Sequence, residues 1–337
     1  MAIGSLEDLK DKKVLVFGAG GGGDALGTIH LYLKLKRIGA EPIAASVVWE
    51  RLVVDPTPGP TPTRAIIGAQ HLGDTIALVR GYEYAERGGR RYIPQVVRLA
   101  KVLGEESIAL GLDLGSEGLV AALNTAKELL GVEAVIAVDS GGDAVAYGCE
   151  EELWSPLADA ISLAGLLDSG VETKLLAIHG YGVDGELSRD YVVKRLSELA
   201  HEGGIIEIAS ITRGDLQFLS RVERVFVSEA SKAPIWAFNG RYGEIWIRGG
   251  TRKIFLDILQ STTTIIDPTV LSRSSGLPNL ARGSRSVYEA SMVLNRRCIY
   301  TELDLEMDLN ASPGESPIDV RRAGKKRLLD GGCAPLC

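Results

Sequence analysis

Long hydrophobic runs are missing from this chain of 337 residues. Its longest aliphatic stretches, such as 14–17 and 135–138, have the length of strands, whereas a membrane helix needs about 20 apolar residues. Residues 1–12 show neither the basic start nor the apolar core of a secretion signal. These absences predict a cytoplasmic protein with no membrane partner.

Glutamine, asparagine, methionine and cysteine are scarce. Four Gln, five Asn and three Met stand against 40 Gly, a bias that we expect of a thermostable protein from a hot environment. The four cysteines form no Cys-x-x-Cys pair, which argues against a structural zinc site. In such an organism an intracellular disulfide is feasible. It would join either Cys333 to Cys337 or the C-terminal tail to the body of the chain.

Basic residues are fewer than acidic residues in this chain. The 37 Lys and Arg face 44 Asp and Glu, which gives a formal net charge of −7. Because nucleic acids are bound through a basic field, we expect no nucleic-acid partner. The one basic run, 321–327, lies in a segment whose proline, glycine and charged residues predict a polar, flexible tail over 310–337. Residues 1–309 are then expected to form a single α/β domain.

Strand patterns alternate with glycine loops and helix patterns along the chain. This order is typical of a three-layer, mostly parallel, Rossmann-like α/β sheet. Apolar residues alternate within 24–38 as in a strand, but the length of the segment and the glycine loop before it favour a helix. Strands are predicted at 12–17, 43–48, 134–138, 175–178, 253–256 and 262–266, and helices at 24–38, 115–130, 157–167, 189–200 and, as the last one, 286–296.

Two segments depart from this alternation. An inserted antiparallel hairpin is predicted near 233–248, with arms at 234–238 and 241–247. Between the arms lies Asn239-Gly240, a pair that suits a type I′ turn. Residues 55–63 hold four prolines, which predicts a stiff extended loop that serves either as a spacer or as a ligand clamp.

The most informative motif is the glycine loop between the first strand and the first helix. Gly18, Gly20 and Gly23 satisfy the pattern G-x-G-x-x-G, in which bare backbone can direct N–H groups at a pyrophosphate. Gly22 lies in the same loop, and Asp24 follows at once. A carboxylate at this place repels a phosphate unless a cation lies between them. The alternative is that Asp24 simply caps the helix.

The same arrangement, a glycine loop with an aspartate directly after a strand, recurs after two later strands. The tetrapeptide Gly-Gly-Asp-Ala at 22–25 recurs at 141–144, and a related loop at 179–186 follows the strand at 175–178. Because the carboxyl ends of parallel strands face one crevice, Asp24, Asp143 and Asp184 are predicted to approach one another, with Asp139 and Glu186 nearby. Clustered carboxylates beside glycines fit Mg²⁺-assisted phosphate chemistry. Three ordinary turns are the alternative, since Gly and Asp are common turn residues.

These loops predict the residues of a ligand site. The predicted catalytic residues are Asp143, Asp184 and His179, of which His179 is placed where a general base could act. Mg²⁺ is expected on Asp24, Asp143 and Asp184. The residues predicted to bind a nucleotide cofactor, ATP or NAD, are Gly18, Gly20, Gly22, Gly23, Asp24, Glu50, Ser140, Gly141, Gly142 and Gly182.

The motifs together resemble a known family. Residues 140–144 alone resemble the nucleotide-phosphate loop of the phosphofructokinase family, a match of five residues that we interpret as local convergence. The whole set is similar to the domain-of-unknown-function family 1152 over roughly residues 12–300, and the resemblance implies an archaeal, cytoplasmic protein without an established reaction. The set comprises Gly-Gly-Gly-Asp24, Trp49-Glu50-Arg51, Asp55-Pro56, Gly59-Pro60, Asp139-x-Gly-Gly-Asp143, Ser155-Pro156-Leu157-x-Asp159 and Gly182-x-Asp184-Gly185-Glu186-Leu187. One departure, Glu151-Glu152-Leu153-Trp154 in place of a small glycine-containing stretch, concerns the lid of the predicted site.

Three functions agree with these observations. The first is an enzyme that binds a nucleotide or a phosphorylated small molecule with Mg²⁺. The second is a NAD- or FAD-dependent Rossmann-type enzyme, for which Glu50 would have to serve as the ribose-binding acidic residue expected about 20 positions after the loop. The third is a non-catalytic sensor or assembly subunit that binds the same ligand without turnover. A small molecule is the partner in each case, and each function is compatible with a homo-oligomer.

Overall fold

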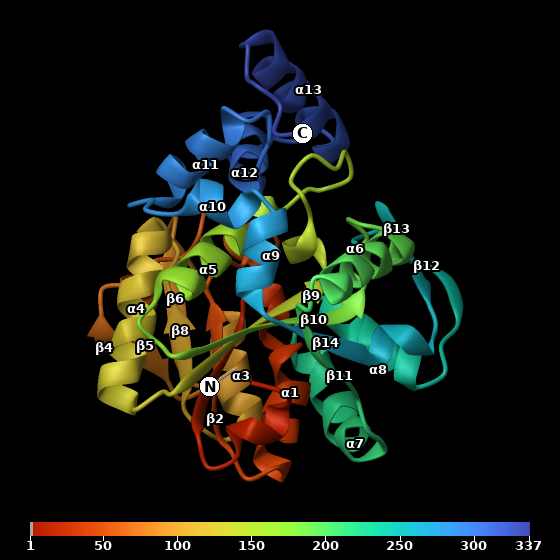
Figure 1. The fold of residues 1–337 in the computed structure, drawn as a ribbon. Helices are drawn as coiled ribbons and strands as arrows, with labels where there is room; N and C mark the ends of the chain where they lie inside the picture. The colour runs from red at the N-terminus through yellow and green to blue at the C-terminus, as the bar shows by residue number, and fades with distance from the viewer. Residues whose placement is uncertain (1–2) are drawn as a thin grey trace.

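Residues 3–337 are described by the structure, a computed structural model, and a nine-stranded sheet runs through them (Figure 1). Its order is β11-β14-β10-β9-β1-β2-β8-β5-β4. The strands from β10 to β8 are parallel to one another, whereas β14 and β5 run antiparallel to their neighbours. The strands are β1 (Lys13–Gly18), β2 (Glu41–Val47), β4 (Gln70–Gly73), β5 (Ile76–Val79), β8 (Ser107–Leu110), β9 (Ala134–Gly141), β10 (Thr173–Tyr181), β11 (Ile205–Ser210) and β14 (Thr262–Ile266).

Helices cover both faces of the sheet, which confirms the predicted three-layer architecture. Successive residues of β1 point to opposite faces: Leu15 and Phe17 belong to one core cluster, Val14 and Val16 to another. The first cluster is closed by α4 (Gly115–Leu130), α5 (Pro156–Asp168), α6 (Arg189–His201), α9 (Pro268–Ser274), α10 (Leu277–Ala281) and α11 (Val287–Asn295). The opposite face is covered by α1 (Thr28–Arg37), α3 (Gln95–Leu103) and α7 (Arg213–Val222).

The central elements lie where the sequence predicts them. The segment 24–38 contains helix α1, so length and glycine context outweighed its alternating apolar residues. Both sides of α1 are buried, because Leu31 and Leu35 pack toward the sheet and Ile29 and Tyr32 pack in a second cluster with α7. Apolar residues all round a helix obscure its 3.6-residue period. No helix within 3–337 has both the length and the apolar character needed to cross a bilayer.

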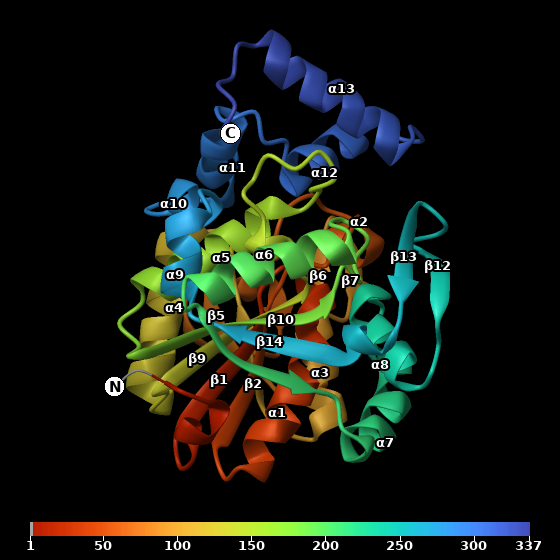
Figure 2. The ribbon, with the colours of Figure 1, turned by 45° about the vertical axis from the view of Figure 1, so that its right-hand side comes forward.

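The antiparallel hairpin is present, but its predicted bounds were wrong. Residues 234–238 belong to a helix, α8 (Ala233–Phe238), and the hairpin pairs β12 (Gly243–Ile247) with β13 (Arg252–Leu256) as a separate two-stranded sheet (Figure 2). The Asn239-Gly240 pair ends α8, where Gly240 adopts a φ of 87° and its N–H donates to the Ala237 carbonyl. A glycine with positive φ suits a helix C-terminus as well as a type I′ turn.

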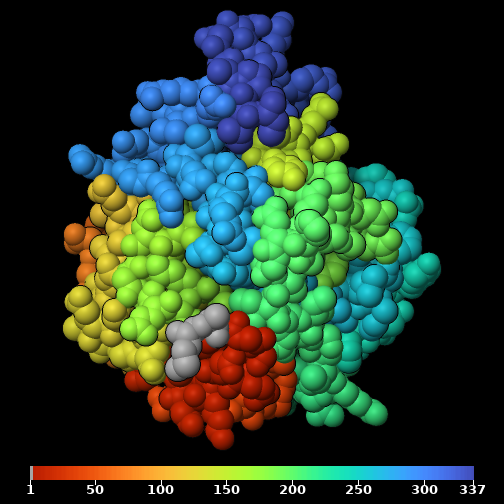
Figure 3. All heavy atoms as spheres, viewed as in Figure 1, coloured from red at the N-terminus to blue at the C-terminus, as the bar shows by residue number. Residues whose placement is uncertain are grey.

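Two helices that were not predicted lie in the C-terminal region, one mostly before the predicted tail of residues 310–337 and one within it. These are α12 (Glu302–Ala311) and α13 (Pro317–Asp330), which begins with Ser316-Pro317, a favourable helix start. Disulfides Cys298–Cys333 and Cys149–Cys337 join this region to the body, so the tail-to-body alternative is confirmed and the Cys333–Cys337 pair is wrong. The C-terminal residues rise beside the segment that follows β9 (Figure 3).

The proline-rich loop leads from β2 into a small side sheet. A short helix, α2 (Arg51–Val54), comes first, and the three-stranded sheet β3 (Ile66–Ile67), β6 (Tyr84–Arg87) and β7 (Arg90–Tyr92) follows. The buried Asp55 carboxylate accepts hydrogen bonds from Tyr92 (2.7 Å) and Thr61 (2.9 Å) and pairs with Arg87. The loop does not line the cavity described below. These contacts of Asp55 hold the loop against the side sheet.

Candidate functional site

A cavity of about 870 Å³ opens at the carboxyl ends of the central parallel strands. Its walls come from the loops after β1, β9 and β10, from α2, and from three parts of the chain far away in sequence. These parts are the segment 227–230, the β12–β13 turn, and α12 with the start of α13. The crevice lies where ligands bind in open α/β sheets.

The floor of the cavity is a cluster of buried carboxylates. The sequence predicted that Asp24, Asp143 and Asp184 converge, and all three line the cavity. Asp139 also lines it, as do Asp159 and Glu186. Two triads can offer ligand oxygens within 4.8 Å of one another, Asp139–Asp143–Asp159 and Asp143–Asp184–Glu186. Asp143 belongs to both.

Asp24 joins the first two glycine loops. Its carboxylate accepts the N–H of Gly20 at 2.7 Å and the N–H of Ser140 at 3.2 Å. Burial raises its pKa to about 6, against the effect of these hydrogen bonds. Because its oxygens bind backbone N–H groups of two loops, Asp24 is not the cap of α1, whose N-cap residue is Gly27.

The first triad is short of hydrogen bonds and of positive charge. Both carboxylate oxygens of Asp159 lack a hydrogen-bond partner among the described residues, although the residue is only 2% exposed. Burial, with the charges of Asp24 and Asp184, raises the pKa of Asp139 to about 8. Burial and neighbouring carboxylates also raise the pKa of Asp143 and of Asp159 well above the usual range. A bound cation or shared protons would relieve this repulsion.

Glu186 differs from its neighbours because protein groups already neutralise it. It accepts hydrogen bonds from the Trp154 N–H (2.6 Å) and the Ser155 hydroxyl (2.6 Å), and Arg252 lies 3.1 Å away. Although burial opposes the shift, the guanidiniums of Arg252 and Arg248 lower its pKa to about 2. In the second triad the arginines already balance Glu186, whereas both carboxylate oxygens of Asp184 lack a hydrogen-bond partner among the described residues.

Two arginines that line the cavity hold strained backbone conformations. Arg51 has a φ of 56° and Arg248 a φ of 52°, a region that costs a non-glycine residue about 1 kcal/mol or more. Arg51 stacks on Trp49 at 4.2 Å and donates to the Gly20 carbonyl at 2.7 Å. Strain of this kind clusters at functional sites, and both side chains line the cavity.

The predicted glycines shape the carboxylate cluster more than they face the cavity. Gly20 and Gly23 line it, whereas the other predicted glycines do not: Gly18, Gly22, Gly141, Gly142 and Gly182. The N–H of Gly20 is used by Asp24, and that of Gly22 donates to the Trp49 carbonyl at 3.1 Å. A Cβ on Gly22 would lie 2.6 Å from a carboxylate oxygen of Glu50. Some of the backbone N–H groups that were predicted to bind a phosphate are thus already used in hydrogen bonds within the protein.

Two further predicted residues, Glu50 and Ser140, do line the cavity. Glu50 is buried and accepts the N–H of Gln95 at 2.9 Å. Burial raises its pKa to about 7, so near neutral pH it holds a proton for much of the time. A protonated carboxyl is a weaker acceptor for ribose hydroxyls than the dinucleotide alternative requires.

His179 lies behind the cavity rather than in it. Its Nδ1 is 2.7 Å from the Thr263 hydroxyl, which also contacts His30 Nε2 at 2.8 Å, and the two imidazole rings stack at 5.2 Å. Burial lowers the pKa of His30 to about 3 and that of His179 well below its usual value. We therefore leave His179 out of the proposed catalytic residues.

This histidine pair predicts a loss of stability in acid. The unfolded chain takes up a proton on His30 with a pKa near 6.5, while the folded state does so only near 3. The contribution of His30 is therefore complete above pH 6.5 and falls by about 3 kcal/mol at pH 4. His30→Gln can hydrogen-bond to Thr263 but cannot be protonated. Its stability relative to wild type is therefore expected to be higher at pH 4.5 than at pH 7.5 in thermal unfolding, since the buried carboxylates contribute equally to both proteins. A difference between the two proteins that does not change with pH would contradict this.

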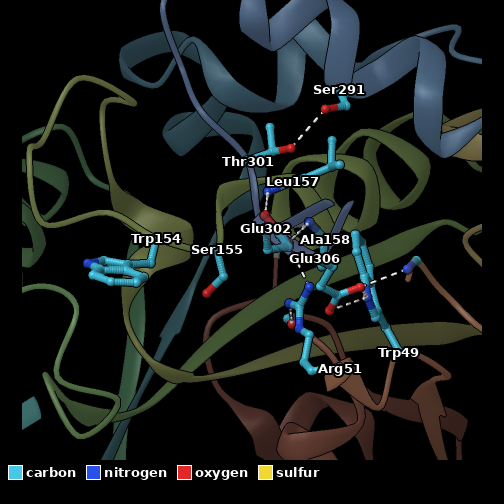
Figure 4. Close-up of polar contacts among 12 residues, drawn as sticks. Trp49, Arg51, Trp154, Ser155, Leu157, Ala158, Ser291, Thr301, Glu302 and Glu306 are labelled. Carbon is cyan, nitrogen blue, oxygen red and sulfur yellow. Dashed lines mark hydrogen bonds and ion pairs between the residues drawn. The ribbon is translucent and has the colours of Figure 1, made fainter. Parts of the chain in front are cut away.

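Sequence reasoning missed the polar partners that come from distant segments. Glu302 of α12 accepts the N–H groups of Leu157 (2.9 Å) and Ala158 (2.8 Å) at the start of α5 and pairs with Arg51 at 3.2 Å (Figure 4). Since α12 itself was not predicted, nothing in the sequence indicated this contact. Asp159 could have been found, because Ser155-Pro156 predicts the start of a helix whose first turn holds it.

A comparison with protein families finds one match. The model of a family described as a protein of unknown function, DUF1152, matches residues 15–310. No curated protein and no solved structure matches the chain significantly.

Proposed function

Because the chain belongs to the domain-of-unknown-function family 1152, whose description assigns no activity, we propose its function from the chemistry of the cavity. The protein binds a divalent cation, with Mg²⁺ the expected ion, together with a phosphorylated small molecule or nucleotide, and acts on that ligand as an enzyme. One observation carries the proposal. In the buried Asp139–Asp143–Asp159 triad, the Asp159 oxygens have no partner within the described residues.

The donor set of this triad fits Mg²⁺ rather than a softer metal. All three residues offer carboxylate oxygens, the ligands that Mg²⁺ prefers, and no histidine or cysteine belongs to the group. A bound Mg²⁺ would supply positive charge that polarises a phosphate oxygen. Asp143 also contacts the Ser155 hydroxyl at 3.3 Å, which holds the carboxylate in place.

Positive side chains around the triad support a phosphorylated ligand. Arg51, Arg248 and Lys232 all line the cavity. Guanidinium groups bind phosphate oxygens with two parallel N–H donors. The buried carboxylates and the positive side chains of the cavity together suit a phosphate that a metal ion bridges to the protein.

Calorimetric titration of ATP, ADP, NAD and a sugar phosphate, each with Mg²⁺ or with EDTA, tests the proposal. We expect Mg²⁺-dependent binding in wild type and a loss of at least about tenfold in affinity in Asp143→Asn, because one charged ligand is removed from the site. Asp319→Asn, an exposed change on α13, is the matched control and is expected to bind as wild type. Unaltered binding by Asp143→Asn would refute the proposal.

The alternatives give different results in the same titration. Metal-independent binding of NAD would favour a dinucleotide enzyme. Saturable Mg²⁺-dependent binding of a ligand, with no product detected by ³¹P NMR after prolonged incubation, would favour a sensor. Asp24→Asn separates the two predicted roles of Asp24: lost binding assigns it to the ligand site, and intact binding limits it to joining the loops.

A further inference from the structure

One face of α12 lines the cavity and changes from charged to apolar along the helix. Glu302, Leu305, Glu306 and Leu309 are spaced by three and four residues, so they share a face of the helix, and all four line the cavity. Glu302 and Glu306 are buried against Arg51 and Trp49, whereas Leu305 and Leu309 stay partly exposed. From Glu302 to Leu309 the helix rises about 10 Å. The wall therefore runs from a charged floor to an apolar mouth.

Two other segments complete the apolar mouth. On α2, Val53 lines the cavity and is 75% exposed. At the start of α13, Pro317 and Ile318 also line it, and Ile318 is 45% exposed. Exposed apolar side chains from three separate segments around one opening mark a binding surface. No side chain of this group has a polar atom, so the group contacts a ligand through apolar surface alone.

Arginine side chains lie against the aromatic side chains of the cavity. Arg252 lies 4.5 Å and Arg321 4.6 Å from the Trp154 ring centre, so guanidiniums contact this ring from two separate segments. Trp49 is fully buried beneath Arg51. A base needs an aromatic face or edge hydrogen bonds for recognition, and the exposed apolar side chains of α2, α12 and α13 provide neither.

We propose that the ligand is an aliphatic phosphate ester, whose phosphate lies at the carboxylate floor and whose hydrocarbon chain extends about 10 Å along α12 to the apolar mouth. This inference rests on the proposed function and narrows its substrate class. It favours alkyl phosphates over nucleotides. The chain is held by loss of water-exposed apolar surface, and the phosphate by the cation and the arginines.

Calorimetry with methyl, butyl and octyl phosphate in Mg²⁺ tests the inference, with AMP as the nucleotide. Each methylene that enters the mouth is expected to raise the affinity up to about fourfold, so octyl phosphate should bind more than about tenfold tighter than methyl phosphate. Leu309→Ser should reduce that ratio by lowering the affinity for octyl phosphate. Met307→Ser, on the same helix but outside the cavity and 46% exposed, is the matched control.

A second variant, on α2, keeps the test valid if Leu309→Ser fails to fold. Val53→Ser alters an exposed side chain of α2 and should reduce the octyl-to-methyl ratio as Leu309→Ser does. Equal affinities for methyl and octyl phosphate, or tighter binding of AMP than of octyl phosphate, would overturn the inference while the proposed phosphate site stands. If none of methyl, butyl and octyl phosphate, inorganic phosphate and AMP binds in Mg²⁺, the proposed function falls and the inference with it.

Discussion

Asp159→Asn is expected to raise the thermal midpoint of the metal-free protein at pH 8 and to remove most of its stabilisation by Mg²⁺. Burial and the charges of Asp139 and Asp24 raise the pKa of Asp159 well above its usual value. The folded state therefore holds a proton where the unfolded chain has released it. Stability from such a group is complete below about pH 4 and is lost as the pH rises through the folded pKa.

The neighbouring residues define the window in which this loss is measured. With folded pKa values of about 7 for Asp184 and about 8 for Asp139, the wild-type protein in EDTA should lose stability between about pH 4 and pH 8. Mg²⁺ should reverse the loss, because its binding stabilises only the folded state. Since Asn carries no charge, the variant should show a smaller fall in EDTA.

Thermal unfolding at pH 5 and pH 8, each in EDTA and in Mg²⁺, measures both effects. A gain of several degrees is expected, as about 1 kcal/mol moves the midpoint of a chain of this size by about 2 °C. Asp319→Asn should follow wild type, because its side chain is exposed on α13. A wild-type midpoint that ignores Mg²⁺, together with a variant less stable than wild type in EDTA at pH 8, would exclude a cation site at this triad.

Glu302→Ala is expected to destabilise the protein by about 3–5 kcal/mol, because it breaks a buried ion pair by removing one partner. The carboxylate pairs with Arg51 at 3.2 Å and accepts the N–H groups of Leu157 and Ala158. Its loss leaves a buried guanidinium without its counter-ion and two N–H groups at the start of α5 without acceptors. Figure 4 shows Glu302 between Arg51 and these two residues.

Urea unfolding of three variants separates the contributions of Glu302. Glu302→Gln keeps an acceptor for α5 and loses only the charge, so its loss of unfolding free energy should be smaller than that of Glu302→Ala. Glu315→Ala, a change at an exposed residue just after α12, should leave the unfolding free energy within about 0.5 kcal/mol of wild type. An alanine variant at position 302 as stable as Glu315→Ala would show that α12 does not hold α5 and Arg51 in place.

The central strands β1, β2, β9 and β10 were predicted from their apolar runs, whereas β4, β5, β8 and β11 were not predicted. All eight residues of β9 are buried, and such continuous apolar runs are typical of central parallel strands. The convergence of Asp24, Asp143 and Asp184 followed from the same topology, since loops at the carboxyl ends of neighbouring parallel strands must meet. Local signals also located helix α4, which begins and ends at the predicted residues 115 and 130.

Local signals failed where one dipeptide serves two structures. Asn239-Gly240 suits a hairpin turn and a helix end equally, and α8 formed because its apolar residues pack beneath the hairpin and beside α7. The tail was misjudged for a related reason. In α13 the buried contact of Arg321 with the Glu151 and Leu153 carbonyls, at 2.8 Å and 2.6 Å, holds a polar segment that composition alone marks as flexible.

By itself the sequence determined the class of fold, the order of the central elements and the three glycine loops with their aspartates. These depend on apolar runs, glycines and chain order, which act over a few residues. Only the tertiary structure decided which carboxylates are left without partners. In the structure, Arg252 neutralises Glu186, and the carboxylate oxygens of Asp159 have no hydrogen-bond partner among residues 3–337. His179 contacts Thr263 outside the cavity, and Glu302 pairs with Arg51. Charge balance in a buried site depends on groups distant in sequence, because burial strengthens electrostatic interactions between whatever neighbours the fold supplies.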